Sequence, residues 1–180
     1  MGARMGWRRR AAVGPAVLLL GLLLAPGRTP AASWHTYEAC RLLPNESNDG
    51  DSFHVHTGRR HHIFRLYHVD APETDLRYRD RVEEQAAYWD IEVGQVLALA
   101  EKAKAFTASF LSESFEVRSR LEDARGASDR KRYFAVVRKG EVYLSMALVE
   151  RGLARIYGYP TDMPDGMDAR GYRWRLRQAE

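Results

Sequence analysis

The chain has 180 residues, of which 45% are hydrophobic, 11% aromatic and 29% charged. This composition excludes a wholly disordered chain, and the length is sufficient for one domain with its own hydrophobic core. Basic residues outnumber acidic ones by 28 to 24, a formal net charge of +4. Positive charge is compatible with an anionic partner such as nucleic acid or a membrane surface, so its position along the chain matters.

The first 32 residues have the layout of a secretory signal peptide. Arginines at residues 8–10 precede an apolar run at residues 13–24, and small residues follow at 31–33. The apolar run is shorter than the roughly 20 residues that span a membrane. We expect cleavage near Ala32, export to the periplasm or the medium, and no stable membrane association afterwards. The alternative is an uncleaved segment that anchors the chain.

Cleavage would change the charge of the protein. Residues 1–32 contain five arginines and no acidic residue, so the remainder has 23 basic and 24 acidic residues, a net charge of −1. Binding of nucleic acid would then depend on locally placed groups rather than on overall charge. Residues 33–180 are expected to form one domain and a monomer. Cys40 is the only cysteine, which excludes an internal disulfide, and we expect its thiol to be buried.

Hydrophobic periodicity places strands before and between helices. Helical spacing predicts a helix over residues 93–110, a short helix at 144–151 that Gly152 ends, and a helix at the end of 165–180. The polar residues 75–90 are expected to form an exposed loop or an irregular helix start. Alternation and turn residues predict strands at residues 37–43, 52–57, 62–69, 115–121, 133–137 and 141–143, with a short one at 153–156. This pattern predicts an α+β fold, a five-stranded OB-fold barrel with about three helices.

Three aspartates border the predicted hairpin. Asp49 and Asp51 directly precede the strand at 52–57, and Asp70 ends the strand at 62–69. Pairing of these strands would bring Asp51 near Asp70. Carboxylates at close range repel each other unless a cation offsets their charge, and Ca²⁺ prefers such oxygen ligands. Taken alone, Asp-Gly-Asp is more often a turn than a metal site.

Arg65 and Glu73 lie near the same strand end. A guanidinium group binds phosphate oxygens in pairs, and a carboxylate can take a proton from water. The competing interpretation is a solvated strand end with surface ion pairs.

The segments Asp49-Gly50-Asp51-Ser52, Phe64-Arg65-Leu66 and Val69-Asp70-Ala71-Pro72-Glu73-Thr74 together resemble the staphylococcal nuclease (thermonuclease) family in order and spacing. Residues 132–137 and 147–154 are similar to its second arginine motif and its short helix. The resemblance runs from about residue 48 to residue 159. It implies an OB-fold endonuclease that depends on Ca²⁺ and hydrolyses the phosphodiester bonds of DNA and RNA with little sequence specificity.

The resemblance also implies roles for single residues. Asp51, Asp70 and the backbone carbonyl of Ala71 would hold Ca²⁺, with Asp49 close by but not a direct ligand. Glu73 would be the general base.

Arginines would hold the phosphate. The resemblance assigns this role to Arg65 and Arg132. The family's Asp-Lys-Tyr-Gly-Arg is one residue shorter here, which makes Arg130 and Lys131 substrate-binding candidates and leaves Arg130 as an alternative to Arg132. Tyr157 and Tyr159 resemble the aromatic pair that borders the nucleotide base; the alternative is ordinary surface tyrosines.

Other interpretations remain open. The chain could be a catalytically inactive OB-fold module that binds nucleic acid or protein, or a metal-binding envelope protein. Several histidines lie around the predicted hairpin, and two of them on one strand could hold Zn²⁺. We expect them instead to form an exposed polar face; they are His54, His56, His61, His62 and His68.

Overall fold

The computed structural model describes residues 1–2, 33–126 and 129–180. The predicted signal peptide lies almost wholly outside the described residues, so export stays a prediction. Among the residues that are described, no helix is both long and apolar enough to cross a membrane. Residues 32–180 form one compact unit of the chain.

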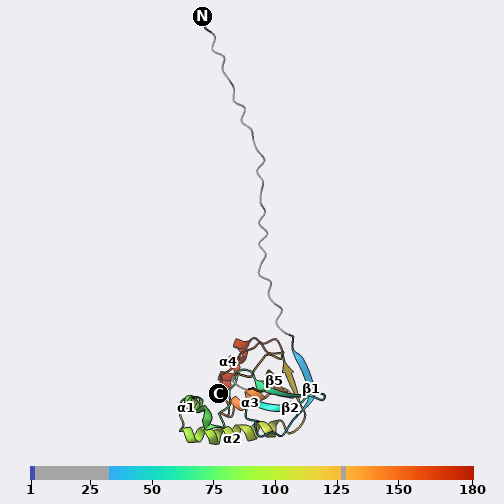
Figure 1. The fold of residues 1–180 in the computed structure, drawn as a ribbon, viewed down its shortest axis with the longest axis vertical. Helices are drawn as coiled ribbons and strands as arrows, with labels where there is room; N and C mark the ends of the chain where they lie inside the picture. The colour runs from blue at the N-terminus through green and yellow to red at the C-terminus, as the bar shows by residue number, and fades with distance from the viewer. Residues whose placement is uncertain (3–32, 127–128) are drawn as a thin grey trace. The chain divides into compact units, whose positions relative to one another are not determined.

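Five strands close into a mixed β-barrel (Figure 1). Neighbouring strands are antiparallel except β3 and β5, whose parallel pairing closes the barrel. A sixth strand, β6 (Val142–Tyr143), extends β5 as a hairpin. The α+β, OB-fold-like barrel that the sequence predicts is confirmed. Its strands are β1 (His35–Leu42), β2 (Ser52–His56), β3 (His61–Leu66), β4 (Phe115–Ser119) and β5 (Tyr133–Lys139).

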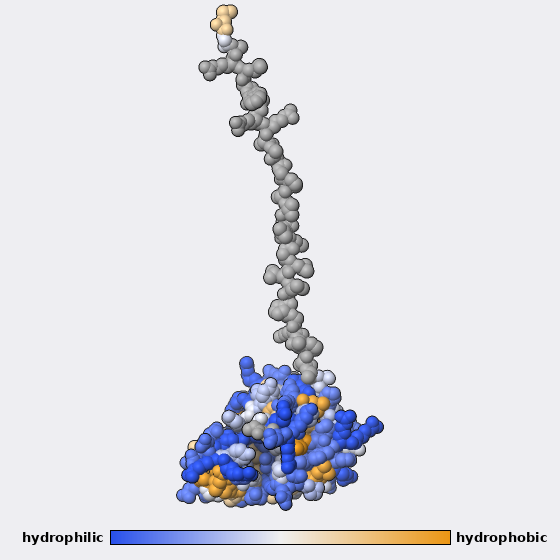
Figure 2. Space-filling model, in the orientation of Figure 1, coloured by the Kyte–Doolittle hydropathy of each residue, from blue (hydrophilic) through white to orange (hydrophobic). Residues whose placement is uncertain are grey.

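The helices lie around the barrel. In Figure 1, α1 and α2 lie together at its lower edge and α4 at its upper left. The bounds are η1 (Leu76–Tyr78, a 3₁₀ turn), α1 (Arg79–Trp89), α2 (Val93–Phe110), α3 (Leu144–Val149) and α4 (Ala169–Ala179). The face of this unit in Figure 2 is largely hydrophilic, with small, separate hydrophobic areas.

The segment predicted as an exposed loop or an irregular helix start is helical, with η1 followed by α1. Its buried stripe is narrow, because only Val82, Gln85 and Ala86 of α1 are buried, while the other side chains are largely polar. Val82 and Ala86 pack against Val96 of α2. Two apolar residues one turn apart are too weak a periodic signal to distinguish a helix from a loop, which explains why the sequence left both alternatives open.

Several strand predictions also differ from the structure, and β4 ends at Ser119 rather than residue 121. β3 stops at Leu66 rather than residue 69, because the chain turns at His68, whose φ of 70° lies in the left-handed region. The strand predicted at 153–156 is a single bridge between Asp70 and Arg155. Gly152 follows α3 with φ of 63°, the conformation that commonly ends helices.

Burial confirms part of the expected core. Phe53 and Val55 face inward on β2, and the Cys40 thiol is fully buried, which raises its pKa to about 11. The expected exposed histidine face is wrong for two members. His54 is 5% exposed, since its ring contacts His61 at 2.8 Å, and His68 is 0% exposed.

Burial of His68 has a consequence for acid stability. Its ring packs edge-to-face on Tyr172, and the backbone N–H of Thr161 donates to Nε2 at 3.4 Å. Burial lowers the pKa of His68 from 6.5 to about 4, with Arg173 adding to this and Asp162 opposing it. The folded state therefore keeps this ring neutral at pH values where the unfolded chain binds a proton. The contribution of His68 to stability is lost as pH falls from 6.5 towards 4.

We predict that His68→Gln flattens this acid dependence. Between pH 7.5 and pH 5 the wild type should lose about 2 kcal/mol more unfolding free energy than the variant, because the unfolded histidine gains a proton that the folded one does not. Urea denaturation of both proteins at the two pH values measures the difference. His56→Gln, a substitution of an exposed histidine, is the control. Equal pH dependence in wild type and His68→Gln would contradict the prediction.

Candidate active site

The Asp49–Asp51 turn is held against helix α2. The Thr107 hydroxyl donates to the carbonyl of Gly50 at 2.7 Å. A Cβ at Gly50 would lie 2.8 Å from the Cβ atoms of both Ala103 and Ala71, closer than side chains pack. Glycine is therefore required for α2 and the segment after β3 to approach the turn together. This contact places the turn and Ala71 side by side.

Asp49 stabilises the turn from within. Its Oδ1 accepts hydrogen bonds from the backbone N–H groups of Asp51 and Ser52, at 3.1 and 2.6 Å. Such a bond to the backbone two residues on is typical of aspartate in turns. Asp49 thus acts structurally in the turn while its carboxylate remains next to that of Asp51.

Asp51 and Asp70 come together as the hairpin pattern predicts. A single nitrogen, Arg65 Nη2, bridges them, at 3.1 Å from Asp51 Oδ2 and 2.8 Å from Asp70 Oδ1. Asp51 Oδ2 also accepts from the backbone N–H of Ala71 at 3.1 Å. Two carboxylates thus share one cation at the end of β3.

Asp70 is the most heavily bonded member of the site and is 1% exposed. Its Oδ1 accepts from Arg65 and from Arg81 Nη2, the latter at 2.7 Å. Its Oδ2 accepts from Arg155 Nε at 2.9 Å and Gln85 Nε2 at 3.1 Å. Four donors satisfy a charge that would otherwise be costly to bury.

Glu73 lies beside this group and is less enclosed. Its side chain is 18% exposed and pairs with Arg81 Nη1 at 2.9 Å. Burial raises the pKa of Glu73, while Arg81 acts to lower it and the carboxylates of Asp51 and Asp70 add to the increase. A carboxylate whose pKa is raised towards neutrality is better suited to accept a proton from water.

Gln85 of α1 fixes the segment that carries these groups. The side chain is 0% exposed. Its Nε2 donates to the Ala71 carbonyl at 3.0 Å as well as to Asp70, and its Oε1 accepts from the backbone N–H of Glu73 at 2.8 Å. The buried Gln85 amide therefore holds the Asp70 carboxylate, the Ala71 carbonyl and the Glu73 backbone N–H in a single arrangement.

Sequence reasoning missed three residues of the site: Arg81, Gln85 and Arg155. Arg81 and Gln85 lie on α1, in the segment expected to be an exposed loop or an irregular helix start, and the stripe of Val82, Gln85 and Ala86 was the available signal. Arg155 is 3% exposed and pairs with both Asp70 and Glu84. No local pattern marks it, because its partners are distant in sequence.

The site holds more carboxyl groups than guanidinium groups, and their close packing is reflected in their pKa values. Burial raises the pKa of Asp49, and the neighbouring Asp51 carboxylate adds to the increase. Burial also raises the pKa of Asp51, although Arg65 opposes it. The pKa of Arg65 is raised in turn, chiefly by Asp51. Five carboxyl groups and three guanidinium groups meet here. The carboxyl groups belong to Asp49, Asp51, Asp70, Glu73 and Glu84, and the guanidinium groups to Arg65, Arg81 and Arg155. We call these eight residues the carboxylate cluster.

The cluster fits a calcium ion in donor type and charge. Asp51, Asp70 and the Ala71 carbonyl are oxygen donors, and the position between the two carboxylates already attracts a cation, the Arg65 guanidinium. In the described part of the chain, no three histidine, cysteine or acidic side chains are arranged to hold a metal ion. Ca²⁺ takes six to eight oxygen ligands, so water or substrate oxygens would have to complete its coordination.

Arg132 lies next to the cluster without joining it. Its Nη1 is 3.4 Å from the hydroxyl of Ser52, which pairs with Arg65 across β2 and β3, and its Nη2 donates to the Arg125 carbonyl at 2.9 Å. Among the described residues, Arg132 forms no ion pair with a carboxylate. Its charge is therefore available to an anion.

Arg130 shares a small hollow with Arg132. The hollow has a volume of about 80 Å³, and Ser47, Ser52, His54 and Ile63 complete its lining. Arg130 Nη1 lies 3.3 Å from Ser47 Oγ. Both alternatives for the second phosphate-binding arginine thus line the same space.

The remaining predicted residues lie on the surface. Lys131 Nζ is 5.3 Å from the centroid of the Tyr133 ring. Tyr157 and Tyr159 are each 53% exposed. The Arg155 guanidinium lies over the Tyr157 ring at 4.3 Å, which places this tyrosine next to the cluster.

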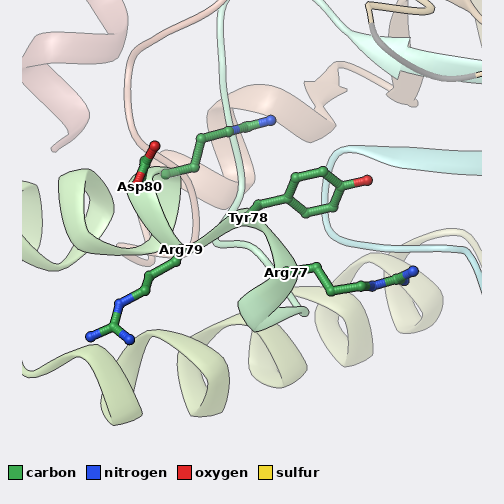
Figure 3. Close-up of a pocket in the computed structure, with 5 residues that line it drawn as sticks. Arg77, Tyr78, Arg79 and Asp80 are labelled. Atoms are coloured by element: carbon green, nitrogen blue, oxygen red, sulfur yellow. The ribbon is translucent and has the colours of Figure 1, made fainter.

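A larger hollow adjoins the cluster at Arg81. It has a volume of about 310 Å³ and is lined by residues 77–81. Figure 3 shows Arg77 and Tyr78 extending to one side of the segment and Arg79 to the other. Arg81 also pairs with Asp70 and Glu73, so one residue belongs both to the lining of the hollow and to the cluster.

No family model matches the chain, and no curated protein matches it.

We predict that Gln85→Leu destabilises the fold by about 3 kcal/mol. The change removes three buried hydrogen bonds of about 1 kcal/mol each and leaves the Glu73 N–H and the Ala71 carbonyl without this partner. Unfolding in urea, followed by circular dichroism, measures the loss. Gln178→Leu, at an exposed position of α4, should change stability by less than about 0.5 kcal/mol. Similar effects of the two substitutions would contradict the role given to Gln85.

Proposed function

We propose that the protein is a Ca²⁺-dependent endonuclease that hydrolyses phosphodiester bonds of DNA and RNA with little sequence specificity, and that it belongs to the staphylococcal nuclease family. One observation carries the proposal: Asp51 and Asp70 share the Arg65 guanidinium, with the Glu73 carboxylate beside them. Oxygen donors for a cation, a phosphate-binding group and a base thus meet at one end of the barrel.

In this proposal Asp51, Asp70 and the Ala71 carbonyl hold Ca²⁺, and Asp49 keeps the turn that carries Asp51 in place. When bound, the ion supplies positive charge for the phosphate oxygens and makes a bound water more acidic. The excess of carboxylates over guanidinium groups in the cluster favours binding of a divalent cation.

Two arginines are proposed to bind the scissile phosphate. Both ion pairs of Arg65 use Nη2, so within the described residues its Nε and Nη1 groups are available to a phosphate. Arg132 contributes a second positive charge from the other side of Ser52. Guanidinium groups stabilise the charge that develops on phosphate oxygens during cleavage.

Glu73 is proposed to take the proton from the attacking water. Its raised pKa and partial exposure support this assignment, and Arg81 keeps the carboxylate oriented at 2.9 Å. General base catalysis of this kind contributes typically 10²–10⁴-fold to the rate.

Groups around the cluster are proposed to bind the rest of the nucleotide. Arg130 and Lys131 precede β5 and would contact neighbouring phosphates. Tyr157 and Tyr159 would border the base, since exposed aromatic rings stack on bases with little sequence preference. An exported monomer without membrane association completes the proposal.

Digestion of DNA and RNA by the purified protein tests the proposal. We predict cleavage of both polymers with Ca²⁺ and none after addition of EGTA. A well-folded protein that binds nucleic acid without cleaving it would instead support the inactive OB-fold module.

The proposed base is tested by Glu73→Gln. We expect a rate at least 100-fold lower, because the amide keeps the shape of the side chain but cannot accept the proton. Initial rates on single-stranded DNA at saturating Ca²⁺ measure the effect. Glu101→Gln, at an exposed glutamate of α2, should retain the full rate. A Glu73→Gln protein with wild-type activity would exclude Glu73 as the base.

A further inference from the structure

Helix α4 concentrates positive charge on one exposed face. Residues 169–179 contain four arginines and no acidic residue. Tyr172 and Leu176 are buried in the core, one turn apart. A different set of residues, spaced i, i+3, i+4 and i+7, falls on one face of the helix: Arg170, Arg173, Trp174 and Arg177. We call these four residues the α4 stripe.

The fold presents this stripe rigidly. The hydroxyls of Tyr172 and Ser145 are 2.8 Å apart in the interior, and the Asp168 side chain caps the helix by accepting from the Gly171 N–H at 2.6 Å. Trp174 is nevertheless 58% exposed, although burial of tryptophan is strongly favourable. A large exposed ring among arginines is therefore not accounted for by packing.

The α4 stripe is connected to the carboxylate cluster. Arg173 Nη2 donates to the carbonyl of Gly158 at 2.8 Å, and Gly158 lies between the exposed rings of Tyr157 and Tyr159. The Tyr157 ring in turn contacts Arg155, which binds Asp70. Contacts through Arg155, Tyr157 and the backbone of Gly158 thus connect the cluster to α4.

We propose that the α4 stripe binds a single-stranded segment of nucleic acid that extends beyond the bond to be cleaved. Arg170 and Arg177 bind backbone phosphates, and Trp174 stacks on a base. The identity of the polymer rests on the proposed function. Sites for single strands combine positive charge along the backbone with aromatic rings on which bases stack.

The spacing and polarity of the helix favour nucleic acid over an anionic membrane. Arg177 lies seven positions after Arg170, a rise of about 10 Å along the helix, which is enough to contact more than one phosphate of a strand. A helix that lies in a membrane interface needs a broad exposed apolar face. Here Tyr172 and Leu176 are buried, and Trp174 is the apolar side chain of the stripe.

Binding without cleavage tests the inference. Fluorescence anisotropy would follow a labelled twelve-nucleotide oligothymidylate bound to Glu73→Gln protein in EGTA, over a range of KCl concentrations. Adding Arg170→Ala and Arg177→Ala should weaken binding at least fivefold. It should also reduce the slope of log affinity against log salt by about 1.4, since each single-strand phosphate contact contributes about 0.7. Trp174→Ala should weaken binding roughly tenfold through lost stacking.

A matched control removes the same charge elsewhere. Arg59→Ala with Arg60→Ala, on the exposed turn between β2 and β3, should change affinity less than twofold. If the stripe variants bind like this control, the inference is overturned. It is also overturned if the stripe is needed for binding to vesicles containing phosphatidylserine but not to the oligonucleotide.

The outcome is separable from that of the proposed function. Stripe-dependent binding by a protein that never cleaves would support this inference and contradict the nuclease proposal. Calcium-dependent cleavage together with unchanged binding by the stripe variants would support the nuclease proposal and overturn this inference. In the active protein, the stripe variants should raise KM for long single-stranded DNA and leave cleavage of bis(p-nitrophenyl) phosphate unchanged.

Discussion

The arrangement of the site depends on the buried carboxylate of Asp70. A charge with 1% exposure is stable only when donors surround it, and Asp70 receives them from the end of β3, from two positions on α1 and from Arg155. The four donors come from three separate parts of the chain, so satisfying one carboxylate aligns three segments. Loss of any one partner would leave buried charge uncompensated, which is more costly than the loss of a surface ion pair.

The same network explains how a rigid site can carry an excess of negative charge. Gln85 holds the Asp70–Glu73 segment from behind, while Gly50 permits the turn with Asp51 to approach it. The carboxylates are thereby kept close despite their repulsion, and burial raises the pKa of both Asp51 and Glu73. Such a site is suited to a divalent cation, because the ion offsets charge that the three arginines do not. In the proposed mature protein, which is near neutral without residues 1–32, a polyanion would be bound through such local features rather than through the overall field.

Short-range patterns predicted much of this structure. Alternation in two neighbouring strands was sufficient to place Asp51 near Asp70, and helical spacing gave the bounds of α2 as observed, Val93–Phe110. The partners of Asp70 on α1 were not predictable in this way, since that helix buries only one narrow stripe. Arg155 has no local signal, because its role arises from contacts with residues about 70 to 85 positions earlier. His54 was expected on an exposed face, but a contact with His61 covers it.

Calcium binding by the carboxylate cluster is the central claim, and isothermal titration calorimetry of the purified protein tests it most directly. We predict one Ca²⁺ bound per chain, and no binding by Asp51→Asn, which removes one of the two bridging carboxylates. Asp90→Asn, at an exposed residue that ends α1, should bind as the wild type does. A folded wild-type protein that binds no Ca²⁺ at millimolar concentrations, or an Asp51→Asn protein that binds it normally, would contradict the account.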